Sequence, residues 1–173
     1  IQSYLKLKHK LQAIMLIIPR HPERFDEVFN LVNDNKLNVK RRSDEHKCDD
    51  MTEFLIGDSM GEMMSYYSIC DIAFIGGSLS NTGGQNMLEA AASSKPIIYG
   101  PRVFNFEEVS KMLLESNSAL QVNNADELLQ SVSDLLSDNE KREKLGLNAK
   151  ACFESHRGAV TRLMNLIKPY IKN

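Results

Sequence analysis

Two glycine pairs and a glutamate after them are the residues whose types and spacing point most directly to chemistry. The segment reads Gly76-Gly77-Ser78, then Gly83-Gly84-Gln85-Asn86, with Glu89 following. It lies between an apolar run and a predicted helix. Glycines let the backbone pass close to a ligand and turn its N–H groups toward it, and a helix N-terminus adds positive partial charge at the same place. The segment is therefore predicted to cradle a phosphate group.

The spacing of these glycines excludes two familiar phosphate loops. The segment lacks the Gly-x-Gly-x-x-Gly fingerprint of dinucleotide-binding folds, and it lacks the Gly-Lys-Ser/Thr ending of a P-loop. The competing interpretation is a glycine-rich connection without a ligand. We favour ligand binding, because a purely structural turn rarely needs four glycines.

Glu89 admits two interpretations. Its carboxylate, one turn into the predicted helix, could accept hydrogen bonds from a ribose diol. It could instead satisfy the amide of the cap residue Asn86, in the pattern called a capping box. We favour ribose binding, because only this box follows two glycine pairs. The same spacing recurs at three other predicted helix starts: Ser59 and Glu62, Asn105 and Glu108, and Asn124 and Glu127.

Other candidate contacts lie in loops that follow predicted strands. Arg20 directly follows the first apolar run, where its guanidinium could pair with a phosphate or carboxylate, or could simply lie exposed. The segment Gly57–Gly61, which contains Met60, could contact a base edge through main-chain groups or form a plain loop. Ser78 is a candidate phosphate donor. The sequence offers no convincing general base and no partners for a nucleophilic serine.

Short apolar runs alternate with helical patterns along the whole chain. Such alternation predicts an α/β fold: a Rossmann-like parallel sheet with helices on both faces and right-handed crossovers. Ligands then bind outside the carboxyl ends of the strands, where the loops named above are expected. We predict strands at 13–18, 38–41, 54–56, 72–75, 96–99 and 119–122, and helices at 22–33, 61–70, 87–94, 106–116 and from 125 onward, with breaks near Asp138 and Gly158.

Composition is that of an ordinary globular protein, and we predict a single domain over residues 1–173. The formal net charge of -2 gives no reason to expect nucleic-acid binding. Cys48, Cys70 and Cys152 lack a metal-ligand spacing, so we expect no metal site and a reducing environment. The longest apolar run, 13–18, is too short to cross a bilayer.

Several segments, taken in order, resemble 3-deoxy-D-manno-octulosonic acid (Kdo) transferases, and the resemblance covers nearly the whole chain. A double glycine with a glutamate five residues after the second pair is also typical of nucleotide-sugar glycosyltransferases of the GT-B type. One departure is Ala90, where the family often has proline. The matching segments are Pro19–Phe25, Arg41-Arg42-Ser43, Gly57–Glu62, Phe74–Ser78, Gly83–Glu89, Gly100-Pro101 and Asn105-Phe106-x-Glu108.

The resemblance implies one half of a GT-B glycosyltransferase, namely the C-terminal domain that binds the donor CMP-Kdo, with no cofactor and no metal. The chain begins at Ile1 without a methionine, as a piece of a longer protein would. The other half of the family's enzymes carries a membrane anchor, the lipid A precursor site and the catalytic glutamate, so no catalytic residue is expected here. The implied nucleotide-binding residues are Arg20, Met60, Gly61, Gly76, Gly77, Ser78, Gly83, Gly84, Gln85, Asn86 and Glu89.

By this resemblance, Arg20 and the glycine segments would hold phosphate and sugar, Glu89 the ribose, and Met60 with Gly61 the cytosine. We expect the chain to bind CMP or CMP-Kdo and to transfer nothing alone. The full-length enzyme would be an inverting transferase of lipopolysaccharide biosynthesis at the cytoplasmic face of the bacterial inner membrane. The segment Gly158–Ile171 would pack on its other domain. Alternatives are a UDP-sugar transferase or epimerase domain, or a non-catalytic nucleotide-binding module.

Overall fold

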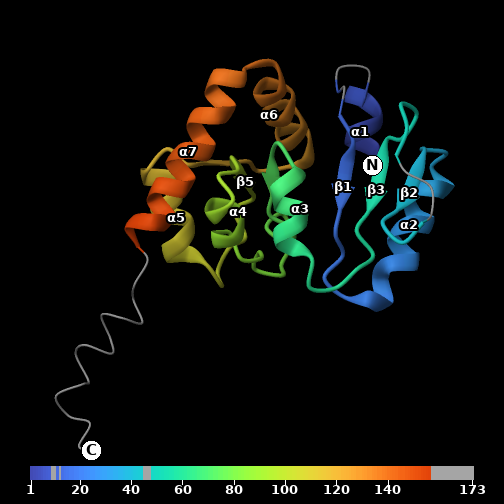
Figure 1. The fold of residues 1–173 in the computed structure, drawn as a ribbon, viewed down its shortest axis with the longest axis horizontal. Coiled ribbons are helices and arrows are strands. Elements are labelled where there is room, and N and C mark those ends of the chain that lie inside the picture. The colour runs from blue at the N-terminus through green and yellow to red at the C-terminus, as the bar shows by residue number, and fades with distance from the viewer. Residues whose placement is uncertain (9–10, 12, 45–47, 157–173) are drawn as a thin grey trace, which may run out of the picture. The chain divides into compact units, whose positions relative to one another are not determined.

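A computed structural model describes residues 1–8, 11, 13–44 and 48–156 of the chain (Figure 1). The described residues form two compact units, one comprising Ile1–Ser65 and the other beginning at Tyr66. The predicted closing segment Gly158–Ile171 and its expected packing lie outside the described residues.

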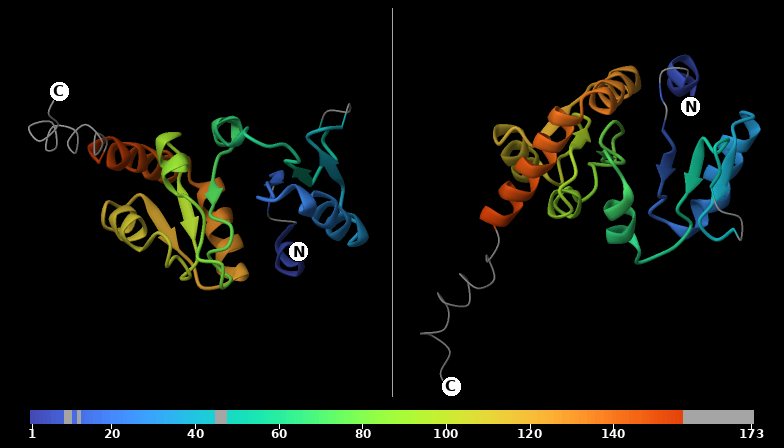
Figure 2. Two further views of the ribbon diagram at one scale, coloured as in Figure 1. Left: turned by 90° about the horizontal axis from the view of Figure 1, so that it is seen from below. Right: turned by 45° about the horizontal axis from the view of Figure 1, so that its top comes forward.

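The first unit is a small parallel sheet with helices packed beside it (Figure 2). Its strand order is β1-β3-β2, and both pairs are parallel. Phe54 of the central strand lies opposite Met15 and Val39, and the side chain of Phe54 is buried. The elements are α1 (Gln2–Leu7), β1 (Met15–Ile17), the 3-10 helix η2 (Pro22–Arg24), α2 (Phe25–Asp34), β2 (Val39–Arg41) and β3 (Phe54–Ile56).

The second unit repeats the βα alternation with a second three-stranded parallel sheet of order β4-β5-β6. All three residues of the central strand β5 are buried, as expected for a strand covered on both faces. The helix α3 (Met63–Ile69) leads into this unit. The other elements are β4 (Ala73–Phe74), α4 (Leu88–Ala92), β5 (Ile97–Tyr99), α5 (Glu107–Glu115), β6 (Ala119–Gln121), α6 (Ala125–Ser137) and α7 (Asn139–Ser155).

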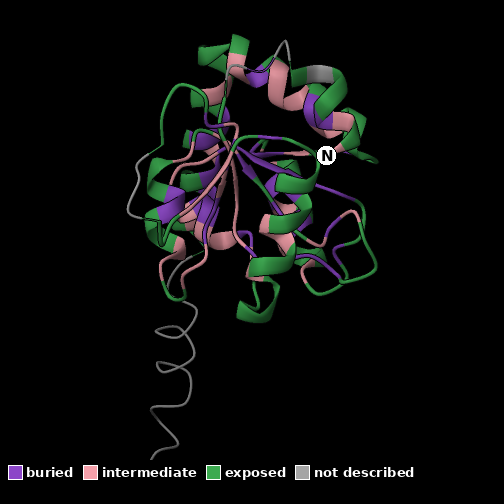
Figure 3. Ribbon diagram, turned by 90° about the vertical axis from the view of Figure 1, so that its right-hand side faces the viewer, coloured by how far each residue is buried: buried purple, intermediate pink, exposed green. Residues whose placement is uncertain are grey.

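A hydrophobic cluster joins the second sheet to the two C-terminal helices of the described chain. Ile98 of β5 and Leu135 of α6 are fully buried, and Val122 and Leu145 complete the cluster. Figure 3 colours the chain by burial; in the second sheet β5 is buried throughout, whereas β4 and β6 each begin with a buried residue and end with an exposed one. No helix within the described residues is long and apolar enough to cross a bilayer.

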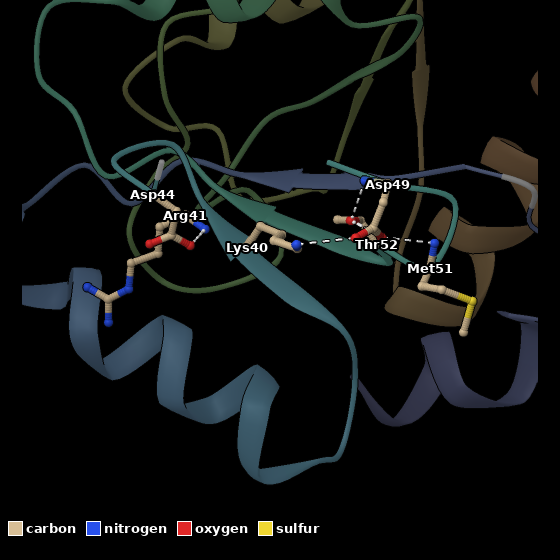
Figure 4. A network of polar contacts seen from close by, with 6 residues as sticks. All are labelled: Lys40, Arg41, Asp44, Asp49, Met51 and Thr52. Atoms are coloured by element: carbon tan, nitrogen blue, oxygen red, sulfur yellow. Dashed lines mark hydrogen bonds and ion pairs between the residues drawn. The ribbon is translucent and has the colours of Figure 1, made fainter. Parts of the chain in front are cut away.

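Polar contacts hold both ends of the connection between β2 and β3 (Figure 4). The amide of Arg41 donates to Asp44 Oδ2 at 2.8 Å, which closes a turn directly after β2. Before β3, Asp49 accepts hydrogen bonds from Thr52 Oγ1 at 2.9 Å and pairs with Lys40 Nζ at 3.2 Å. The Thr52 hydroxyl first, and then Lys40, hold the pKa of Asp49 below its usual value.

The six predicted strands are all present, each within three residues of its expected bounds, and β3 has the predicted ones. The helix α1 was not predicted. An isolated six-residue helix is not stable in water, so α1 depends on tertiary contacts. The ring of Tyr4 packs edge-on against the ring of Phe54, with the ring centroids 4.8 Å apart. Glu53 Oε1 accepts hydrogen bonds from Tyr4 Oη at 3.4 Å and from Lys8 Nζ at 3.1 Å.

Candidate functional site

The glycine loop follows β4, as predicted, and its own packing requires some of its glycines. Gly77 and Gly83 have φ angles of +77° and +83°, a region that favours glycine. A β-carbon on Gly77 would overlap Thr82 Oγ1, and one on Gly83 would overlap the ring of Phe104. The structure therefore explains these two glycines without a ligand, which weakens the argument from glycine number alone.

The remaining features of the loop do point to a ligand. Gly76 is exposed, has no left-handed φ, and a β-carbon there would meet no atom within 4 Å. Gly83 and Gly84 are buried, and neither amide donates a hydrogen bond to an acceptor in the described part of the chain. Buried amides in native proteins are nearly always paired with protein, water or a bound group. These amides are thus suited to contact an anion.

Ser78 departs from the prediction. Its side chain is fully buried, its Oγ donates to the carbonyl of Ile75 at 2.5 Å, and the same oxygen accepts from the amide of Gly100 at 2.8 Å. A serine hydroxyl has one proton to donate, and this one is used by the backbone. The hydroxyl predicted to meet a phosphate instead joins the carboxyl ends of β4 and β5.

Glu89 lies in the first turn of α4, but not in a capping box. The N-cap of α4 is Met87, and Asn86 Oδ1 accepts from the amide of Leu88 at 3.0 Å. The Glu89 carboxylate accepts from Asn86 Nδ2 at 3.2 Å rather than from a backbone amide. Burial, and then the charge of Glu89, raise the pKa of Tyr67 to about 12, so the carboxylate lies near this buried phenol.

The short α4 changes the electrostatics expected at this loop. The helix has five residues, Leu88–Ala92, where eight were predicted at 87–94. Because peptide dipoles sum along a helix, a helix of this length adds less positive potential than a long one. The loop amides, rather than the helix dipole, would have to supply most of the attraction for an anion.

The other predicted capping boxes have mixed outcomes. Asn124 Oδ1 accepts from the amide of Glu127 at 2.9 Å, which confirms the predicted cap. The Glu127 carboxylate accepts from the amide of Asn123 at 2.9 Å, one residue before the cap residue whose amide it was expected to bind. The Asn123 amide helps to hold the pKa of Glu127 below its usual value. The Asn105 box is wrong: Asn105 donates to the carbonyl of Thr82 at 3.4 Å, and α5 is capped at the next residue.

In the first unit, carboxylates join the loops that follow β2 and β3. The amide and the hydroxyl of Ser43 donate to Asp58 at 2.9 and 2.5 Å. Glu62 accepts from Arg42 Nη2 at 3.4 Å and also from the hydroxyl of Ser59. The role of Asp58 was not predicted, although its segment belongs to the resemblance described above.

The predicted contact residues of the first unit lie at the same edge of its sheet. Arg20 is exposed and follows β1, and Met60 is exposed to 62% after β3. Gly61 has a φ of +78° and open space around it. In the second unit Phe104, whose ring lies against Gly83, is 58% exposed. Phe104, an exposed aromatic residue beside the glycine loop, was not predicted as a contact residue from the sequence.

A separate groove of about 740 Å³ lies between α5 and α7 and contains none of the predicted contact residues. Its walls include Glu108 and Met112 of α5 and Cys152 of α7, with His156 at one end. Within the described residues, no group of three or more His, Cys, Asp or Glu side chains is placed to hold a metal ion.

Comparison with known proteins identifies the family. The model of the family Glycosyl transferases group 1 matches residues 7–151. The chain is 44% identical over 160 residues to 3-deoxy-D-manno-octulosonic acid transferase of Haemophilus influenzae and 34% identical over 161 residues to that of Bordetella pertussis. Each alignment covers 92% of this chain and 38% of the relative, so the chain spans well under half of their length.

A solved structure shares the fold. The crystal structure of the C-terminal CMP-Kdo binding domain of WaaA from Acinetobacter baumannii matches with a TM-score of 0.81 and 31% identity, over 87% of this chain and 79% of that one. This confirms the predicted α/β fold of one half of a GT-B enzyme. The chain therefore belongs to the glycosyl transferases group 1, and within that family it is a homologue of the C-terminal domain of 3-deoxy-D-manno-octulosonic acid transferases.

Proposed function

We propose that this chain is the donor-binding domain of a Kdo transferase and that it binds CMP-Kdo. The observation that carries the proposal is the pair of buried glycine amides, at Gly83 and Gly84, without an acceptor in the described residues. Support also comes from the fold, which is shared with a domain described as binding CMP-Kdo. Backbone amides that donate to no protein acceptor can hold an anion, and a nucleotide sugar presents a phosphate.

In the second unit, the proposed contacts follow the order of the chain. The amides of Gly76-Gly77 and Gly83-Gly84 hold the phosphate, and Gln85 and Asn86 contact the sugar. Glu89 accepts hydrogen bonds from the ribose hydroxyls. The carboxylate accepts a hydrogen bond from Asn86 at Oε1, and because an ionised carboxylate has about four lone-pair sites, it can also accept from a diol. Ser78 acts through the backbone of the loop.

In the first unit, the proposed contacts are Arg20, Met60 and Gly61. The guanidinium of Arg20 would pair bidentately with the phosphate or a carboxylate of the donor. Met60 and Gly61 lie in an exposed loop whose main chain and thioether would contact the cytosine. Each of these residues follows the carboxyl end of a strand, where ligands of parallel α/β folds bind.

The reaction of the longer protein is proposed to be an inverting transfer of Kdo from CMP-Kdo to a lipid A precursor, in lipopolysaccharide biosynthesis. The acceptor hydroxyl attacks the anomeric carbon, that carbon's bond to the phosphate oxygen breaks, and CMP leaves. Amides and Arg20 stabilise the charge of the departing phosphate, so the scheme needs neither cofactor nor metal. The base that takes the hydroxyl proton, the acceptor site and the anchor to the cytoplasmic face of the inner membrane belong to the part of the protein outside this chain.

Calorimetric titration of the 173-residue chain with CMP and with UMP tests the proposal. We expect CMP to bind at least about tenfold more tightly than UMP, a preference worth about 1.4 kcal/mol. Absence of binding by either nucleotide would overturn the donor-binding role. Equal binding of both would favour a UDP-sugar enzyme instead. The chain alone should show no transfer of Kdo to a lipid A precursor, because neither base nor acceptor site is expected in it.

Glu89→Gln tests the ribose contact. The change keeps the shape and the bond from Asn86 but weakens charge-assisted bonds to two hydroxyls, so CMP affinity should fall about 10–150-fold, or about 1.5–3 kcal/mol. Glu127→Gln is the matched control, because Glu127 is a capping carboxylate of another helix. It should lower the melting temperature slightly and leave CMP affinity unchanged. CMP affinity of Glu89→Gln within twofold of wild type would remove the ribose assignment.

A further inference from the structure

We propose that Ser78 is a positioning residue that clamps the end of β4 to the loop after β5, and that this clamp sets the glycine loop for phosphate contact. The inference deepens the proposed function and rests on it. It replaces a ligand contact expected from sequence with a contact inside the protein. Two groups of Ser78, its hydroxyl and its carbonyl, make the clamp.

The hydroxyl makes one half of the clamp. Its oxygen lies 2.5 Å from the carbonyl of Ile75, to which it donates, and 2.8 Å from the amide of Gly100, from which it accepts. Ile75 directly follows β4 and Gly100 directly follows β5. The hydrogen bonds between β4 and β5 end with the strands. The Ser78 side chain adds a further link between the two strands, at the first residue after each of them.

The carbonyl makes the other half. It accepts from the amide of Arg102 at 2.9 Å, so the loop after β5 is held at two amides by one serine. A β-carbon on Gly100 would overlap this same carbonyl and the side chain of Leu79. Gly100 has no left-handed φ, so the reason for glycine at this position is the close approach of Ser78.

A ligand role for the hydroxyl conflicts with this geometry. Donating its proton to a phosphate would remove the 2.5 Å bond to the carbonyl of Ile75 and leave that carbonyl with the longer bond from the Ser78 amide, at 3.4 Å, beside a fully buried side chain. Gly76, which is exposed, and Gly77 immediately precede Ser78 in the chain. Holding Ser78 at both of its ends therefore fixes the direction in which those two amides point.

The same two loops touch a second time. Asn105 Nδ2 donates to the carbonyl of Thr82 at 3.4 Å, and Phe104 packs against Gly83. This second contact should keep the loops together when the clamp is weakened. A Ser78→Ala chain is thus expected to fold, with its loop shifted rather than lost.

The test compares Ser78→Ala with Ser118→Ala in the full 173-residue chain, by thermal unfolding and CMP titration. Ser118 is a matched control, because it is also fully buried but lies at the amino end of β6, away from the loops. Ser78→Ala should lower the melting temperature by about 3–10 °C and weaken CMP binding by about fivefold or more. Ser118→Ala should lower the melting temperature and leave CMP affinity within twofold.

Two results for Ser78→Ala would overturn the proposal. A lower melting temperature with unchanged CMP affinity would mean that Ser78 only stabilises the fold. A loss of CMP affinity at an unchanged melting temperature would mean that Ser78 contacts the nucleotide directly. If wild type does not bind CMP, the proposed function fails first. Should Ser78→Ala not fold, hydrogen exchange of the Gly100 amide in wild type decides: equal protection with and without CMP supports the clamp, and faster exchange with CMP overturns it.

Discussion

The loops at the carboxyl ends of the two sheets are held in opposite ways. In the first unit, Asp58 accepts from Ser43, and Glu62 pairs with Arg42 at 3.4 Å between side chains that are 38% and 54% exposed. In the second unit, a fully buried serine and closely packed glycines hold the loop after β4. One edge is tied by carboxylates near solvent, and the other by buried backbone contacts.

This difference has consequences for how each loop serves a ligand. Exposed ion pairs contribute about 0.2–1 kcal/mol and are screened by salt. Buried hydrogen bonds and close packing are insensitive to salt and tolerate little displacement. A phosphate cradle needs donors fixed in direction before the ligand arrives, which suits the second edge. A loop that contacts a base through exposed groups can adjust, which suits the first.

The largest expected effect comes from two glycines with nearly the same backbone angle. Gly83 and Gly61 have φ of +83° and +78°, but only Gly83 is packed against a side chain. A left-handed alanine costs about 1–2 kcal/mol, and overlap in a packed site adds about 1–3 kcal/mol. Urea unfolding should therefore show a larger loss for Gly83→Ala than for Gly61→Ala. Equal losses would mean that the second edge is not more rigid than the first.

Removing the Asp58 carboxylate should have a smaller effect. Asp58→Ala deletes the acceptors for both the amide and the hydroxyl of Ser43, so we expect a loss of about 1–2 kcal/mol in the free energy of unfolding. Hydrogen exchange should show the Ser43 amide as the site of greatest change. Asp58→Asn keeps one acceptor oxygen and should recover part of the loss. No change at Ser43 would indicate that the carboxylate does not order this turn.

Acid should loosen the first unit before the second. The pKa of Glu53 lies below its usual value: burial raises it, but the Asn38 amide and Lys8 outweigh burial. A lowered folded-state pKa gives stability that is present above the unfolded value of about 4.3 and is lost as pH falls through the folded one. Between pH 6 and pH 3, the protection of amides against exchange, relative to the intrinsic exchange rate at each pH, should fall earlier near Asn38 than in β5. In the Glu53→Gln chain, amide protection near Asn38 should change less with pH. An unchanged pH dependence would contradict the attribution of this acid sensitivity to Glu53.

The smallest expected effect is that of the exposed pair between Arg42 and Glu62. Arg42→Ala should cost at most about 1 kcal/mol at low salt and almost nothing at about 1 M salt, where the screening length is about 3 Å. Unfolding at both salt concentrations measures the difference. Ser78→Ala serves as the contrast, because its loss should not depend on salt. A salt-independent loss for Arg42→Ala would remove the distinction between the two edges.

Local pattern was a good guide where one physical signal dominated. Apolar runs such as 97–99 are buried as a whole, so β5 and the alternation around it could be predicted. The Asn124 cap was predictable because capping is a contact within four residues. The Asn105 cap failed because Thr82, 23 residues away, takes the Asn105 side chain. Helix α1 was missed for the same reason, since Phe54 and Glu53 hold it from far along the chain.

Sequence by itself determined the α/β alternation, the position of the glycine loop and the family resemblance, because each depends on residue types in short, ordered segments. Only the tertiary structure decided what Ser78 does. Its partners are the carbonyl of Ile75, three residues before it, and the amide of Gly100, 22 residues after it. A serine beside two glycines has the same appearance in a sequence whether its hydroxyl faces a phosphate or a neighbouring strand. The choice depends on burial and on which strand lies alongside, and both arise only when the chain has folded.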